Sequence, residues 1–184
     1  MNFTSSFFLF GFPVILVLYH RSLPACRRSL LLAASWMFYA FGSPGSFWLL
    51  IFVTLITYLC AVSMERAATK RTRHFFLLLA AGVVLFILFL FKYLGFLEQN
   101  FDTLLGIRKE IHQLPLPAGI SFYTFQSLVY CIDVYQKRIT AEKNFFRYAL
   151  FVSFFPQLVA GPIEQAADLM PQLECKKTAS ANRL

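Results

Sequence analysis

Long apolar runs separated by short polar stretches divide most of the chain. Five of them span about 7–19, 30–41, 47–63, 75–97 and 119–135. A helix needs about 20 mostly apolar residues to cross the hydrocarbon core of a bilayer, and runs of this kind are typical of such helices. The pattern therefore predicts an all-α protein, a polytopic bundle of five transmembrane helices. Lys92, near the end of the fourth run, is expected to reach the headgroups.

A sixth apolar stretch, 145–160, has a different character. At about 1.5 Å per residue it is short for a core about 30 Å thick. Pro156 interrupts it, and Gly161 and Pro162 break the chain just after it. It is either a sixth span or a re-entrant element buried among helices, and the breaks favour the second. Residues 174–184 carry no packing face and are predicted to form a disordered tail.

The 119–135 segment carries polar residues that share one helical face. Pro117 and Gly119 precede it and are expected to break the chain there. At spacings of i, i+3, i+7 and i+10 lie Tyr123, Gln126, Tyr130 and Asp133, which we call the polar stripe. Lipid would leave an amide and a carboxylate unsatisfied, so protein or a water-filled cavity is expected beside this face.

Each member of the polar stripe has a structural and a functional interpretation. Asp133 either lines a substrate path or pairs with Lys137, four residues later, and its place near the segment end favours the pair. Gln126, with its two tyrosine neighbours, either lines a cavity or bonds to another helix. Such interhelical polar contacts contribute only about 0.6 kcal/mol on average and are common, which favours helix contact.

Composition requires a bilayer. Hydrophobic residues make up 58% of the 184 and charged residues 14%, with 23 phenylalanines, whereas about a quarter of an ordinary soluble domain is charged. A soluble fold of this size could not bury so much apolar surface, so the chain is expected to be an integral membrane protein with the lipid bilayer as partner. The net charge of +8 is spread over short clusters between apolar runs. This distribution argues against a nucleic-acid partner.

The basic clusters predict an orientation. They fall after the first, third and fifth segments (Arg21, Arg27 and Arg28; Arg66, Lys70, Arg71 and Arg73 with Glu65; Lys137, Arg138, Lys143 and Arg147). The 42–45 turn is uncharged, and the 98–118 stretch is slightly acidic. By the positive-inside rule the basic loops are cytoplasmic and the N-terminus is outside, in a multi-pass protein of the bacterial inner membrane.

Short motifs of common catalytic or metal sites do not occur in the sequence. There is no GxSxG, HExxH, P-loop or GxGxxG pattern. The four cysteines show no CxxC spacing, so neither a metal site nor a disulfide framework is predicted.

Several blocks together resemble a known family. They are NFTSSFFLFGFPVILVLYH at 2–20, ASWMFYAF at 34–41, FKYLGF at 91–96, LPAGISFYTFQSLVYCIDVYQ at 116–136, FFRYALFVSFFPQLVAGPIE at 145–164 and LMPQL at 169–173. Through them the chain resembles the membrane-bound O-acyltransferase family, and most of all its bacterial branch that O-acetylates alginate and other polysaccharides. The resemblance covers residues 1–173 and implies the N-terminal part of that fold.

The resemblance has two departures. Gln165 stands where the family often has a basic residue. The family's proposed catalytic histidine lies in a later apolar segment, and none of the three histidines here, His20, His74 and His112, falls in such a segment. No catalytic residue is therefore assigned in this chain, which is expected to be an N-terminal portion, inactive alone.

The resemblance implies transfer of an acyl group, most simply acetyl, to hydroxyls of an exported, alginate-like polysaccharide. No bound cofactor is implied, but an acyl donor is, as are a polysaccharide acceptor and other O-acetylation or export proteins. The polar stripe would then line one wall of a funnel for the reactants, while Arg147 is more simply an interfacial anchor than a ligand of the donor's phosphate. Two alternatives remain: a non-enzymatic scaffold subunit of a modification or export complex, and a small transporter. The transporter is disfavoured because the chain lacks internal repeats and several intramembrane charges.

Overall fold

The computed structural model describes residues 6–23, 26–105, 117, 119–160 and 165–174. These residues are helical or in connecting turns, without a strand. The elements are α1 (Ser6–Arg21), α2 (Arg27–Gly42), the 3-10 turn η1 (Pro44–Ser46), α3 (Phe47–Arg66), α4 (Lys70–Leu105), α5 (Ile120–Tyr135), α6 (Phe145–Ser153), α7 (Phe155–Ala160) and α8 (Ala166–Glu174). The predicted all-α class is confirmed.

Three helices form the centre of the molecule. α3 packs against both α4 and α5, and these two also contact each other. α3 and α4 are antiparallel because only residues 67–69 join them. The Thr69 hydroxyl accepts a hydrogen bond from the Thr72 N–H (3.2 Å) and caps the start of α4. α5 runs in the same direction as α3, so the ends of these two helices lie at the same side.

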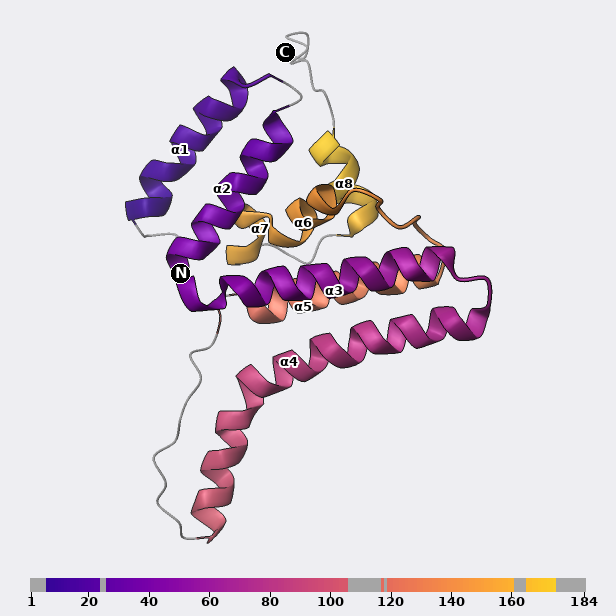
Figure 1. Cartoon of the computed structure of the whole chain (residues 1–184). Helices are drawn as coiled ribbons and strands as arrows, with labels where there is room; N and C mark the ends of the chain where they lie inside the picture. Colours follow the sequence, from indigo (N-terminus) through magenta and orange to yellow (C-terminus); the bar gives the residue numbers. More distant parts are fainter. Residues whose placement is uncertain (1–5, 24–25, 106–116, 118, 161–164, 175–184) are drawn as a thin grey trace.

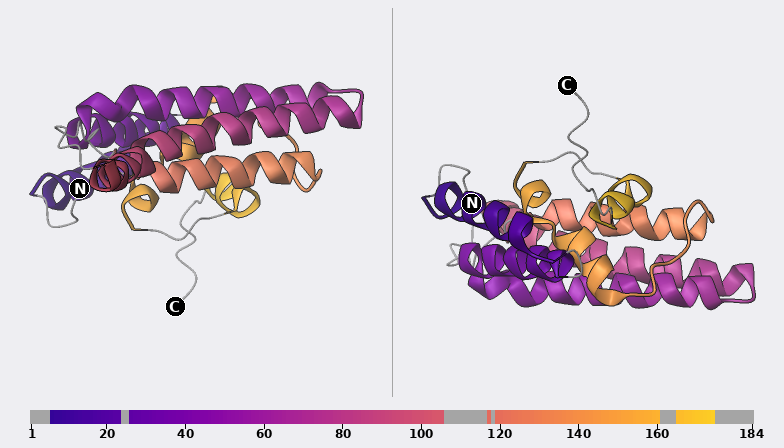
Figure 2. Two further views of the ribbon diagram at one scale, coloured as in Figure 1. Left: turned by 90° about the horizontal axis from the view of Figure 1, so that it is seen from below. Right: turned by 90° about the horizontal axis from the view of Figure 1, so that it is seen from above.

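The remaining helices cover one side of this group. α2 packs on α6 and α7, and α6 also contacts α3 (Figures 1 and 2). The Asn144 side chain caps α6 by accepting from the N–H groups of Phe146 (3.0 Å) and Arg147 (3.4 Å). This cap turns the chain from the 136–144 loop into α6, beneath α2.

The predicted segments coincide with helices, with one clear difference in length. The helix predicted at 75–97 begins at Lys70 and continues to Leu105, over 36 residues. Lys92 therefore lies well inside α4 and not in its last turns; it is exposed, and its ammonium lies 5.6 Å from the Tyr93 ring centre. In Figure 1, α4 bends where it leaves α3.

Among the described residues, two helices, not five, are long and apolar enough to cross a bilayer by length and composition. They are Phe47–Arg66 and Lys70–Tyr93, with mean hydropathies of 2.2 and 2.8. α1, α2 and α5 have 16 residues each, and 16 residues rise only about 24 Å along a helix axis. The predicted count of five spanning helices is thus not reproduced by this criterion, because three of the helices are short.

The sixth predicted segment, 145–160, forms two short helices. α6 ends at Ser153 and α7 begins at Phe155, with the break at Phe154. The position of the break differs from the one expected, because Pro156 lies in the first turn of α7. A proline is tolerated there since the first N–H groups of a helix have no partner within it. The other predicted breaks, Gly161 and Pro162, lie outside the described residues.

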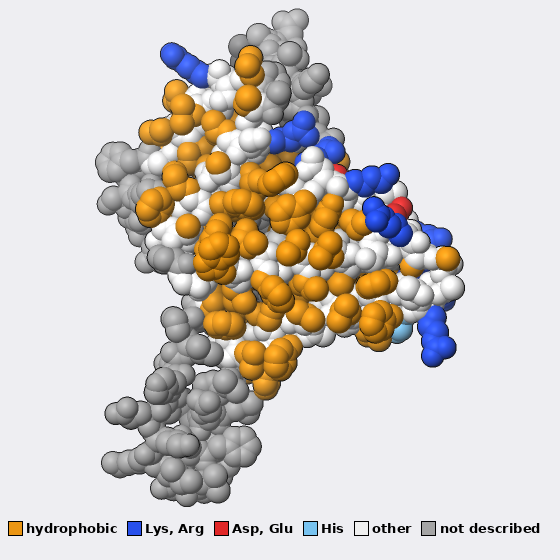
Figure 3. Space-filling view, viewed as in Figure 1, with side chains coloured by type: hydrophobic (Ala, Val, Ile, Leu, Met, Phe, Trp, Pro, Cys, Tyr) orange, Lys and Arg blue, Asp and Glu red, His pale blue; other side chains and the backbone are white. Residues whose placement is uncertain are grey.

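Large apolar side chains are exposed along the outer faces of α3 and α4. Trp48 is 75% exposed, and exposed apolar residues continue at helical spacing through Phe52, Leu55 and Leu59. In Figure 3 such side chains cover the visible face, and most of the visible Lys and Arg gather at one edge. In water this surface would be unfavourable, whereas contact with lipid chains requires it. The described surface fits a membrane protein.

Candidate functional site

The polar stripe on α5 is buried within the helix bundle. Tyr123 is 0% exposed, Gln126 and Tyr130 are 1% exposed and Asp133 is 7% exposed. The stripe therefore faces protein, one of the two surroundings that its composition required. A role of the polar stripe in lining a funnel stays a prediction. Within the described residues, its side chains contact neighbouring helices and the 136–144 loop.

Gln126 links α5 to the end of α6. Its Nε2 donates to the backbone oxygen of Phe151 at 2.8 Å. Phe151 lies in the last turn of α6, whose carbonyls have no partner within the helix, and the Phe155 N–H donates instead to the Ser35 hydroxyl on α2 (3.3 Å). Gln126 thus satisfies a carbonyl that the break at Phe154 leaves open. This is the interhelical contact that was the favoured structural interpretation.

Tyr130 belongs to a cluster of tyrosines between α3, α5 and α6. Its ring centre lies 4.6 Å from that of Tyr148, and its hydroxyl accepts the Glu142 N–H at 2.8 Å. The Tyr148 hydroxyl donates to Thr57 Oγ1 (2.9 Å), and the Tyr58 hydroxyl donates to the Lys143 backbone oxygen (2.5 Å). The bonds to Glu142 and Lys143 hold the 136–144 loop against the bundle, and the bond between Tyr148 and Thr57 joins α6 to α3.

Asp133 pairs with Arg138, not with the predicted partner Lys137. Its Oδ1 lies 3.5 Å from Arg138 Nη1. The helix ends in a Schellman motif, in which the N–H of Arg138 bonds to the oxygen of Asp133 (2.9 Å) and that of Lys137 to the oxygen of Val134 (3.1 Å). Lys137 takes a left-handed conformation with φ 60° to close this motif. The chain has therefore left the helix, so the i+4 spacing on which the Lys137 prediction relied no longer applies.

Arg73 closes the same end of α5 from a neighbouring helix. Its Nη2 donates to the backbone oxygens of Val134 (3.0 Å) and Tyr135 (2.9 Å), and its guanidinium lies 5.8 Å from the Tyr135 ring centre. A cation is favourable there because the last carbonyls of a helix carry partial negative charge. From sequence, Arg73 was only one of several basic loop residues; its position one turn into α4 was the available signal.

Unpartnered polar atoms lie at the other end of the stripe. The rings of Tyr123 and Tyr39 meet edge-on at 6.3 Å. The two hydroxyls approach each other, but among the described residues neither makes a hydrogen bond of good geometry, and Thr124 Oγ1 and Gln126 Oε1 also have no partner there. Each such buried atom costs about 1–3 kcal/mol if nothing satisfies it. A further polar partner is therefore expected at this end of α5.

The predicted breaks before α5 are present. Gly119 has φ 71°, in the left-handed region, and stands immediately before the helix. A glycine adopts this conformation without the penalty that other residues incur. Pro117 is buried, and its oxygen accepts the Ile120 N–H at 3.2 Å. These two residues direct the chain into the buried start of the polar stripe.

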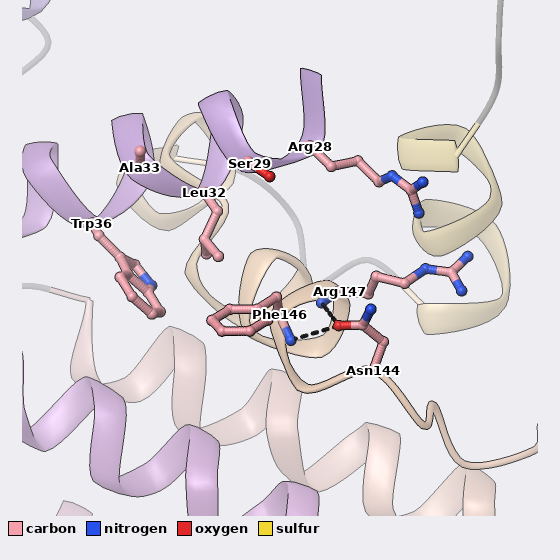
Figure 4. Close-up of a pocket in the computed structure, with 8 residues that line it drawn as sticks. All are labelled: Arg28, Ser29, Leu32, Ala33, Trp36, Asn144, Phe146 and Arg147. Atoms are coloured by element: carbon pink, nitrogen blue, oxygen red, sulfur yellow. Dashed lines mark hydrogen bonds between the residues drawn. The ribbon is translucent and has the colours of Figure 1, made fainter. Parts of the chain in front are cut away.

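A pocket of about 460 Å³ opens between α2 and the start of α6. Figure 4 shows Arg28 and Arg147 at one end of it and Trp36 at the other. The residues that line it are Arg28, Ser29, Leu32, Ala33, Trp36, Asn144, Phe146 and Arg147. Arg147 Nη1 also lies 3.5 Å from Glu142 Oε2. The sequence placed both arginines on the same predicted side of the membrane, Arg28 as an orientation signal and Arg147 as an interfacial anchor rather than a ligand of the donor's phosphate, but it did not bring them together.

His20 and His74 lie in neither the polar stripe nor the pocket. His20 and His74 are exposed, and the His74 ring packs at 5.9 Å from Tyr135. His112 lies outside the described residues. Within the part of the chain that the structure describes, no three His, Cys, Asp or Glu side chains are grouped so as to hold a metal ion.

Comparison with known proteins identifies relatives along almost the whole chain. It is 40% identical over 179 residues to the probable alginate O-acetylase AlgI of Pseudomonas putida, covering 94% of this chain and 37% of that protein. The Pseudomonas aeruginosa protein of the same name is 38% identical, with 94% and 34% covered. The peptidoglycan O-acetyltransferase of Helicobacter pylori is 31% identical, with 98% and 40% covered.

The chain is a relative of bacterial O-acetyltransferases. The resemblance to the membrane-bound O-acyltransferase family, stated above from the sequence blocks, is thereby confirmed. The chain spans between 34% and 40% of the length of these relatives. No family model matches it, and no solved structure matches it.

Proposed function

We propose that this chain is the N-terminal portion of a membrane O-acyltransferase that transfers acetyl groups to hydroxyls of an exported or cell-surface polysaccharide. The observation that carries the proposal is the identity of about 40% to alginate O-acetylases over 94% of the chain. The acceptor, the acyl donor and the accompanying export proteins belong to the proposal, as do the five-span topology and the inner-membrane location.

Residues 1–184 would supply scaffold and part of a reactant funnel, and would be inactive alone. A histidine acting as general base can activate a hydroxyl whose own pKa is far too high for it to react at neutral pH. The exposed positions of His20 and His74 support the view that neither acts in this way within a buried funnel. The unpartnered hydroxyl of Tyr123 and Oε1 of Gln126 support a polar occupant, water or substrate, beside the start of α5.

Genetic complementation tests the transferase proposal. The host gene is deleted, and O-acetyl groups on the exported polysaccharide are measured. The complete gene should restore them, whereas residues 1–184 alone should not. Restoration of export without acetyl transfer would favour a scaffold subunit, and unchanged acetylation in the deletion strain would overturn the proposal.

Two tyrosine variants test the funnel role. Tyr123→Phe removes a hydroxyl whose described neighbour is the Tyr39 hydroxyl and which makes no hydrogen bond of good geometry, so the stability of the fold should change by less than about 1 kcal/mol. If the hydroxyl contacts a reactant, acetylation should fall about tenfold, the ratio that corresponds to 1.4 kcal/mol. The matched control is Tyr148→Phe, which loses the bond to Thr57 and should lower stability by about 1 kcal/mol with activity per folded molecule retained. Full activity of Tyr123→Phe would refute the funnel role.

A further inference from the structure

The pocket between α2 and α6 has one polar and one apolar end. Arg28, Ser29, Asn144 and Arg147 stand at the polar end, while Leu32, Ala33, Trp36 and Phe146 form the remaining walls. From Arg28 to Trp36, eight residues of α2 rise about 12 Å. The headgroup layer on each side of a bilayer is about 5–8 Å thick. A pocket of this extent reaches from the headgroups into the hydrocarbon.

Two arginines lie at the polar end of the pocket, and one of them is beside a glutamate. Arg28 and Arg147 also line a second, much smaller pocket, together with Glu142 and with Met170 and Leu173 of α8. Glu142 lies 3.5 Å from Arg147, and the Arg147 side chain is still 30% exposed. The pocket thus presents the donor groups of two arginines at this end. The planar donors of arginine match phosphate oxygens, so an anion bearing a phosphate complements this end.

The apolar end opens outward and not into the bundle. Ala33 is exposed, and Phe146 is 62% exposed although it is a large apolar side chain. A free phosphate would make no use of these walls, whereas the first part of an acyl chain would cover them. Arg28 and Arg147 also belong to the clusters that predict the cytoplasmic side, where anionic lipids make the membrane surface negative.

We infer that this pocket binds an anionic phospholipid. Its phosphate lies between Arg28 and Arg147, and one acyl chain runs along Leu32, Ala33 and Trp36. The lipid fills the space between α2 and α6. It thereby links α2 to the start of α6 and to the 136–144 loop that precedes it. This site does not depend on the proposed acetyl transfer.

Native mass spectrometry of the complete protein in detergent tests the inference. Phosphatidylglycerol and phosphatidylethanolamine are added in equal amounts, and lipid retention is compared. The wild-type protein should retain phosphatidylglycerol with about tenfold preference, since the ammonium group of phosphatidylethanolamine offsets its phosphate charge and is repelled by the two guanidinium groups. Arg28→Gln should lose most of this preference. The matched control Arg71→Gln removes an equal charge from an exposed position outside the described pockets and should keep it.

A second variant blocks the apolar end without changing any charge. Ala33→Trp adds bulk at an exposed position, so the fold should tolerate it while lipid retention falls at least as much as in Arg28→Gln. If Arg71→Gln lost as much preference for phosphatidylglycerol as Arg28→Gln, the preference would come from general surface charge, and the inference would be overturned. Displacement by coenzyme A, a soluble phosphate ester, but not by excess phosphatidylglycerol would also overturn it, as would retention unaffected by both pocket variants.

Discussion

At the scale of single residues, polar side chains satisfy backbone groups that the helices leave open. Gln126 serves the last turn of α6, and Ser35 serves the start of α7. Within the hydrocarbon core of a membrane no water is present to form hydrogen bonds with these backbone groups. Each of these polar side chains therefore supplies the hydrogen bond that water would supply elsewhere. The positions of these residues were visible in the sequence, but their partners were not. The partners depend on a break at Phe154 that no local signal located.

Lys137 gives a stability prediction at this scale. It holds φ 60° at the end of α5, a conformation that costs an L-residue about 1–2 kcal/mol. Lys137→Gly should therefore raise the free energy of unfolding by about 1 kcal/mol after the greater freedom of glycine in the unfolded chain is counted. Unfolding in mixed detergent with increasing dodecyl sulfate measures the change.

The neighbouring residue provides the control for Lys137. Gln136 has φ −75°, an ordinary helical value, so Gln136→Gly should lower stability by about 0.5–1 kcal/mol. Opposite signs for the two glycine variants are expected. If both variants destabilise the protein equally, the left-handed conformation of Lys137 carries no strain.

At the scale of elements, helix pairs are joined at their ends as well as along their faces. Arg73 on α4 closes α5, Tyr58 on α3 holds the loop before α6, and Glu65 accepts the Ala141 N–H at 3.3 Å. Apolar runs predicted where the helices lie. Their ends were less predictable, as α4 shows, because polar residues beyond Lys92 continue the helix as readily as they would end a membrane span. How far neighbouring helices are shifted along each other depends on these polar contacts between distant residues. The hydropathy of the sequence does not predict such contacts.

Arg73 supplies the prediction for this scale. Arg73→Gln removes charge-assisted bonds to two carbonyls of α5 and should lower the free energy of unfolding by about 2 kcal/mol. Arg73→Lys keeps the charge but not the planar donor group, so an intermediate loss is expected. Arg71→Gln, two residues earlier and exposed, should change stability by less than about 0.5 kcal/mol. Equal losses at both positions would show that Arg73 acts only through net charge.

At the scale of the whole molecule, two of the three basic loops lie at one end of the central helices. The bond between Glu65 and the Ala141 N–H brings the 67–69 loop beside the 136–144 loop, as the alternation of charge requires. The η1 turn lies at the opposite end of α3, whose 20 residues rise about 30 Å, the thickness of the hydrocarbon core. Sequence and structure thus agree that these two loops lie at the same end of α3, and the orientation of the whole chain stays a prediction.

Cysteine labelling tests this topology. In a variant without native cysteines, Gly45→Cys places a thiol in η1, where an added Cβ meets nothing within 4 Å. Ala68→Cys and Thr140→Cys place thiols at exposed positions of the two basic loops. In spheroplasts, a membrane-impermeant maleimide should label the thiol at 45 directly and those at 68 and 140 only after lysis, because basic loops stay in the cytoplasm. Replacing the arginines of the first basic loop by glutamates should weaken this asymmetry. Equal labelling of the thiols at positions 45 and 68 in intact spheroplasts would show that α3 does not cross the membrane. Labelling at position 68 but not at position 140 would place the ends of α3 and α5 on opposite sides of the membrane and contradict the predicted topology.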